Sequence, residues 1–201
     1  LEIIKNYGVD QLRYYLIKEV SLGNDGSISL LNLKNCINND LANNYGNLCQ
    51  WVLSFIEKNC ESKIPQPDKF EKIDMDLSED ITKKLPKLIE MIDNQDLNTY
   101  IKEVINFSFK SNKYFNDLEP WKLKKTNIKR MNTVLYCILN QIKSISILLF
   151  PIMPNSVEKT ISSLSLTKKN IFLDEINNQN LLKPGNIIKK GEILFKKIES
   201  D

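Results

Sequence analysis

The hydrophobic pattern of residues 29–60 predicts one long amphipathic helix. Apolar residues recur there at steps of three and four positions, the spacing of one face of an α-helix; they are Leu30, Leu33, Ile37, Leu41, Tyr45, Leu48, Val52 and Phe55. Ser29 is placed to cap the first turn, because its hydroxyl can accept a hydrogen bond from an unpaired backbone amide. Such a stripe has to be buried, so we expect later helices to pack along it.

Five further segments have helical spacing, and they cover residues 10–20, 78–92, 97–116, 128–150 and 155–164. Gly8 interrupts the chain before the first of these segments, and residues 23–26 carry turn-forming residues. Pro86 lies inside the second segment, where it kinks the helix or forces an earlier boundary. The pattern therefore predicts an all-α fold, an antiparallel helix bundle.

The pattern changes after residue 165. Short apolar runs surround turns predicted at Pro184–Gly185 and Lys190–Gly191, which indicates a small β hairpin-like tail. We therefore divide the chain into a connecting segment of residues 1–28, a helix bundle of residues 29–165 and a tail of residues 166–201 with short strands. The chain starts at Leu1 within a continuing pattern, so we expect it to be a piece of a longer protein.

Composition argues against several classes of function. The chain has no histidine, and none of its four cysteines forms a CxxC pair; we therefore expect no zinc site and no histidine base. The glycines form no phosphate-binding loop. Unpaired cysteines, with no signal sequence and no long apolar run, indicate a cytoplasmic protein outside the membrane. We expect no catalytic residue, no metal and no cofactor in this chain.

Positive charge is concentrated after Trp121. The net charge is only +3, but no acidic residue occurs between Trp121 and Arg130. The basic residues of this cluster are Lys122, Lys124, Lys125, Lys129 and Arg130. An aromatic ring beside lysines suits single-stranded nucleic acid, because a base stacks on the ring while the cations neutralise phosphates. The alternative is that Trp121 covers one end of the core and the lysines only solubilise a loop.

The polar face of the long helix is rich in amides, which both donate and accept hydrogen bonds and so suit the edges of bases. Asn47 lies on this face, and Trp51 follows one turn later at the border of the apolar stripe. A solvated helix face has the same appearance. Both interpretations therefore stay open at the level of single residues.

Several motifs in register resemble the C-terminal part of bacterial methionyl-tRNA synthetases; they are YGVDQLRYYLIKEV, INNDLANNYGNL, NKYFNDLEPWKL and LLFPIMP, within residues 1–165. The resemblance implies that the bundle is an anticodon-binding domain that recognises the CAU anticodon of methionine tRNA. It implies anticodon contacts by Asn47, Trp121 and Trp51, although the family commonly has Arg where this chain has Trp51. The basic cluster after Trp121 would hold the RNA backbone.

The same resemblance implies a parent enzyme, a methionine–tRNA ligase that attaches methionine to tRNA with ATP. Its catalytic domain, with the ATP, Mg and Zn sites, would precede Leu1, so this chain alone should be inactive. Its partners would be the tRNA and its own catalytic domain. We expect no extra C-terminal tRNA-binding domain of the kind that dimerises some members of the family, and therefore a monomer.

Two alternatives remain. The bundle could belong to another class I synthetase, such as the cysteinyl or leucyl enzyme, although the NL and PW motifs in register argue against this. It could instead be a helical scaffold that binds a protein partner through the long helix. The scaffold predicts a contiguous exposed apolar patch, whereas the tRNA-binding hypothesis predicts an exposed Trp121 amid positive charge.

Overall fold

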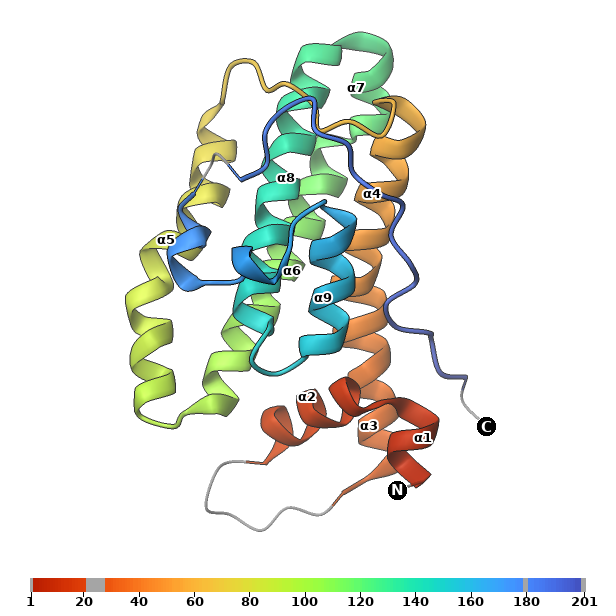
Figure 1. Ribbon diagram of the computed structural model, residues 1–201, viewed down its shortest axis with the longest axis vertical. Coiled ribbons are helices and arrows are strands. Elements are labelled where there is room, and N and C mark those ends of the chain that lie inside the picture. The colour runs from red at the N-terminus through yellow and green to blue at the C-terminus, as the bar shows by residue number, and fades with distance from the viewer. Residues whose placement is uncertain (1, 21–27, 179–180, 200–201) are drawn as a thin grey trace.

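The computed structural model describes residues 2–20, 28–178 and 181–199, and this part of the chain forms a helix bundle (Figure 1). The elements are, in order, α1 (Glu2–Tyr7), α2 (Val9–Glu19), α3 (Leu30–Cys36), the π-helix η1 (Ile37–Gly46), α4 (Asn47–Asn59), α5 (Lys72–Asp93), α6 (Leu97–Leu118), α7 (Pro120–Thr126), α8 (Ile128–Leu149), α9 (Pro154–Ser163) and the 3₁₀ turns η2 (Lys168–Asn170) and η3 (Leu173–Ile176). The predicted all-α class is confirmed. The turn predicted within residues 23–26 lies outside the described residues.

The predicted long helix is present, as α3, η1 and α4 in direct succession. Ser29 caps it as predicted, and its side chain accepts a hydrogen bond from the amide of Asn32 at 3.3 Å. The middle section has wider π turns, which apolar spacing alone did not predict. Within it the carboxylate of Asp40 accepts hydrogen bonds from Tyr14 at 2.9 Å and Lys18 at 2.7 Å. These bonds fix α2 to the long helix.

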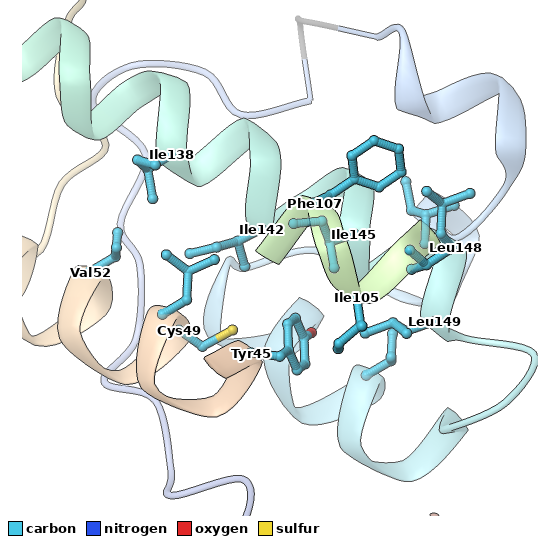
Figure 2. Packing of buried hydrophobic residues seen from close by; sticks show 14 of the residues in the cluster. Tyr45, Cys49, Val52, Ile105, Phe107, Ile138, Ile142, Ile145, Leu148 and Leu149 are labelled. Atoms are coloured by element: carbon cyan, nitrogen blue, oxygen red, sulfur yellow. The ribbon is translucent and has the colours of Figure 1, made fainter. Parts of the chain in front are cut away.

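Helix α8 forms the centre of the bundle and packs against α4, α5, α6, α7 and α9. Figure 2 shows side chains of the long helix, including Tyr45 and Val52, facing the isoleucines of α8. The hydroxyl of Tyr45 lies 2.8 Å from that of Ser146, so this buried polar group is paired. By length and composition α8 could cross a membrane, but 83% of its apolar window is buried inside the protein. Burial as the core helix accounts for that composition.

Helix α5 begins at Lys72, earlier than the predicted residue 78. Its start is set by polar groups: the amide of Glu71 donates to Asp74 at 2.8 Å in a capping box. Pro86 does not end the helix. Pro86 and Thr82, whose carbonyl loses its amide partner, are both exposed, so water can replace the missing hydrogen bond.

The prediction of short strands in the tail is wrong for the described residues. The only β pairing among them is an isolated antiparallel bridge between Lys63 and Ile187. The turn at Pro184–Gly185 is present, and Gly185 has a φ of 87°, which favours glycine. Lys190–Gly191 forms no turn. A hairpin does not form because the tail's backbone pairs with the bundle, as when the amide of Ile188 donates to the carbonyl of Ser62 at 2.8 Å.

The tail instead lies along the long helix (Figure 1). Phe195 packs beside Gly46, where an added Cβ would come within 3.2 Å of its ring. Further along, the side chain of Asn38 exchanges two hydrogen bonds of 2.8 Å with the backbone of Ile198. The tail therefore covers one side of the long helix as an extended segment.

Candidate nucleic-acid interface

The PW motif begins a short helix that the apolar pattern did not predict. Glu119 adopts a φ of 44° and ends α6, and Pro120 occupies the first position of α7. Proline suits this position because its φ is already helical and its missing N–H would be unpaired there anyway. In Figure 1, α7 and the end of α4 lie at the same end of the bundle, opposite α1, α2 and α3. Trp121 thus lies in the first turn of α7.

A groove of about 390 Å³ lies between α4 on one side and α6 and α7 on the other. It is lined by Trp51, Ser54, Phe55, Lys58, Asn59, Phe115, Asn116 and Trp121. The two tryptophans are exposed, Trp51 by 47% and Trp121 by 42%. The fold therefore brings both tryptophans of the chain to one apolar groove with polar and cationic edges.

The two indole rings are supported differently. Trp121 packs edge-on against Phe115, with ring centroids 5.9 Å apart and planes at 66°, an arrangement that fixes aromatic pairs. Trp51 makes no ring contact with another aromatic residue in the described part of the chain. Trp121 thus covers a small part of the core and still presents much of its surface to solvent. Its packing against Phe115 agrees with the interpretation that Trp121 covers one end of the core, and base stacking on its exposed surface stays a prediction.

Asn47 lies one turn before Trp51 on α4 and is half-buried. It is not one of the residues that line the groove. Its side-chain amide donates to the carbonyl of Asn43 at 3.4 Å, a long hydrogen bond. Its carboxamide therefore remains able to bond to a group that approaches this face of α4.

The lysines after Trp121 fall into two groups. Lys122 pairs with Glu119 at 2.8 Å and Lys129 with Asp68 at 3.6 Å, so their charges are partly neutralised. Lys124 and Lys125 are exposed and form no ion pair with any described residue. Burial raises the pKa of the Cys60 thiol at the end of α4, and the positive charge of Lys124 opposes that rise. Lys124 therefore places its charge near the end of α4 that carries the groove.

The structure gives Arg130 a different place from the one its sequence cluster suggested. Its guanidinium donates to both carboxylate oxygens of Asp74, at 2.5 and 2.8 Å, and Asp74 is completely buried. Burial opposes the ionisation of Asp74, but hydrogen bonds from Arg130 and Tyr114 outweigh it and lower the pKa of the carboxyl. Arg130 thus belongs to a buried ion pair and contributes little to the exposed positive surface.

Sequence reasoning missed several groove residues, among them Ser54, Lys58 and Asn116. The spacing of Trp51, Phe55 and Lys58 was a usable signal, because residues three and four apart share one helix face. Asn116 gave no such signal, since its helix meets α4 only in the folded chain. The described residues contain no group of three or more Cys, Asp or Glu side chains arranged to hold a metal ion.

Residues 64–201 match the family model described as the anticodon binding domain of methionyl tRNA ligase. The chain belongs to this family. Residues 1–53 match a second model, described as tRNA synthetases class I (M). The second match ends within α4 and the first begins in the loop that follows α4, so residues 54–63 lie in neither matched range.

Curated relatives and solved structures agree with this assignment. The chain is 35% identical to the methionine–tRNA ligase of Thermotoga maritima over 98% of this chain and 31% of the relative. It is 40% identical to the Brucella melitensis methionine–tRNA ligase over 82% of this chain and 32% of the relative. The chain thus spans about a third of the length of these relatives. The free-state crystal structure of Mycobacterium tuberculosis methionyl-tRNA synthetase superposes with a TM-score of 0.93 at 29% identity, covering 100% of this chain and 41% of that chain.

Proposed function

We propose that this chain is the tRNA-binding part of a methionine–tRNA ligase and that it recognises the CAU anticodon of methionine tRNA. The observation that carries the proposal is the pair of exposed tryptophans, Trp51 and Trp121, on one groove at the end of the bundle. Unstacked anticodon bases offer both faces and edges to a protein. Trp121 stacks on one base, and Asn47 hydrogen-bonds to a base edge nearby.

The RNA backbone is held by the exposed lysines that lack ion pairs within the described residues. Lys124 and Lys125 lie on α7 next to Trp121, where they contact phosphates without reading sequence. Lys122 and Lys129 contribute less, because each already faces a carboxylate. Arg130 takes no part, because Asp74 holds its guanidinium.

In the whole enzyme this contact selects the tRNA, while a separate catalytic domain with ATP and Mg attaches methionine. Exposed apolar residues at the opposite end of the bundle support a contact with that domain; they are Ile4, Val9, Leu30 and Leu31, exposed by 39% to 66%. We expect this chain alone to be inactive in aminoacylation, and the whole enzyme to be monomeric and cytoplasmic. Light scattering of the whole enzyme tests the monomer.

Tryptophan fluorescence tests the proposed recognition. The chain is titrated with a synthetic RNA stem-loop that carries the CAU anticodon and, separately, with one that has a single changed anticodon base. We expect the CAU loop to quench the emission at a lower concentration. Equal and salt-sensitive quenching by both loops would leave only a basic surface, and the anticodon proposal would fail. If the isolated chain responds to neither loop, the same titration is repeated with the whole enzyme.

A further inference from the structure

A second pocket lies away from the two tryptophans, between α5, α8 and the turn η3 of the tail. In Figure 1 the tail passes from α9 towards α5 across α8, and η3 packs against α8. The volume of the pocket is about 320 Å³, within the ~300–1,000 Å³ range of small-ligand pockets. The pocket therefore forms where the tail folds back onto the bundle.

Hydrogen bonds hold the tail in place as one wall of this pocket. The hydroxyl of Thr82 on α5 donates to the side-chain oxygen of Asn177 at 2.8 Å. The buried side chain of Lys143 on α8 donates to the carbonyls of Asn178 at 2.8 Å and Ile176 at 3.4 Å. Because the side-chain oxygen of Asn177 already accepts a hydrogen bond, its amide hydrogens remain for a ligand. The wall is therefore formed before any ligand arrives.

The α8 wall carries polar groups that lack partners. Ser144 is only 6% exposed and lines the pocket, yet its hydroxyl forms no hydrogen bond with a described residue. Such a group is rare in a folded protein, because leaving it unpaired costs stability. The amide nitrogens of Gln141 and Asn140 donate to the backbone carbonyls of Leu77 at 3.1 Å and Tyr136 at 3.0 Å. Their side-chain oxygens accept no hydrogen bond within the described ranges, so α8 offers the pocket two acceptors and a hydroxyl.

The remaining lining residues limit the charge and shape of a ligand. Among the described residues that line the pocket only Glu79 is charged, and it pairs with Lys83 at 2.6 Å. With no cation in the lining, an anionic ligand would lose its hydration without a compensating charge. Phe70 and Tyr136 meet edge-on in the lining, with ring centroids 6.5 Å apart and planes at 71°. This aromatic pair suits a flat ring.

We infer that this pocket binds an uncharged nitrogen heterocycle with an amino group, of the size of a free nucleobase such as adenine. The amino group donates to the side-chain oxygens of Asn140 and Gln141. Ser144 and Asn177 donate to ring nitrogens, which are acceptors, and the aromatic pair contacts the ring. The site is a small-molecule site on the tail side of the bundle, and it does not depend on anticodon recognition.

Nuclear magnetic resonance of the ¹⁵N-labelled chain, titrated with adenine, tests the place of binding. We expect the side-chain amide signals of Asn140, Gln141 and Asn177 to move. The two indole N–H signals, from Trp51 and Trp121, should stay in place, because these residues line the other groove. Movement of the indole signals alone would place adenine in that groove and would overturn the inference. No movement of any signal would overturn it as well.

One variant and one second ligand test the hydrogen bonds in the same titration. Ser144→Ala should weaken adenine binding by about 2- to 13-fold, the effect of losing one hydrogen bond. Ser111→Ala is the matched control and should change nothing, because Ser111 is also buried and unpaired among the described residues but does not line the pocket. Hypoxanthine, which has a carbonyl in place of the amino group, should bind more weakly than adenine, because its oxygen would face the amide oxygens. Equal affinity of Ser144→Ala and wild type, or of adenine and hypoxanthine, would overturn the inference.

Discussion

The buried ion pair between Arg130 and Asp74 provides a sharp test of what Arg130 does. In the Arg130→Met variant the completely buried Asp74 loses two hydrogen bonds and the only cation that pairs with it among the described residues. The amide of Glu71 and the hydroxyl of Tyr114 still donate to the carboxylate. Breaking a buried pair from one side costs about 3–5 kcal/mol. With two donors left we expect the lower end, about 3 kcal/mol, a large part of the 5–15 kcal/mol typical of a domain.

The assay is urea denaturation followed by far-UV circular dichroism. Lys125→Met, which removes an exposed cation from the same cluster, is the matched control and should stay within about 0.5 kcal/mol of wild type. The double variant Asp74→Asn with Arg130→Met should recover part of the loss, because no buried charge then remains unpaired. A loss below about 1 kcal/mol in Arg130→Met, or weaker RNA binding with unchanged stability, would refute a structural role for Arg130.

The same pair predicts a pH dependence. Because the pKa of Asp74 is lowered in the folded protein, its ionised form contributes stability above the unfolded pKa of about 3.9. This contribution is lost as the pH falls through the folded pKa. The difference in the free energy of unfolding between wild type and Arg130→Met should therefore have its full value at neutral pH and should become smaller below about pH 4. If this difference stayed constant down to acidic pH, the ion pair of Asp74 with Arg130 would not be its source.

Three further predictions concern the RNA surface and the tail. Trp121→Ala should weaken binding of the CAU loop by ~1–3 kcal/mol without unfolding the domain; unfolding would mean that its packing matters more than its exposed face. Changing Lys124 and Lys125 together to Gln should reduce the salt dependence of binding without altering anticodon preference, and an altered preference would show that they read bases. Lys143 of α8 is buried and donates to the carbonyl of Asn178 in the tail at 2.8 Å. Burial lowers its pKa to about 8, whereas in the unfolded chain Lys143 keeps its proton to about pH 10.4. The free energy of unfolding of the wild type should therefore rise between these pH values relative to that of Lys143→Met. Urea denaturation at several pH values measures this, and the same pH dependence in both proteins would contradict the prediction.

Local chemistry explains why much of the bundle could be predicted from sequence. The stripe that predicts a helix over residues 128–150 corresponds to α8, and Ser29 caps the long helix as its hydroxyl suggested. Helical periodicity and capping involve residues only a few positions apart, so the sequence contains the whole signal. The predicted tail strands failed for the opposite reason: the hydrogen bonds of that segment go to the bundle, at residues such as Ser62 and Ser163.

The candidate site also has features that follow from local sequence and features that depend on the fold. The sequence by itself determined that Trp121 follows a proline, that lysines come after it and that Asn47 and Trp51 share a face of one helix. Only the tertiary structure decided that Trp51 and Trp121 line one groove, because packing of α6 and α7 against α4 places them there. It also decided that Arg130 pairs with Asp74, while Lys124 and Lys125 keep exposed charges. Charge and aromaticity are properties of single residues, whereas the burial of a side chain and its ion-pair partner depend on which helices, distant in sequence, pack together.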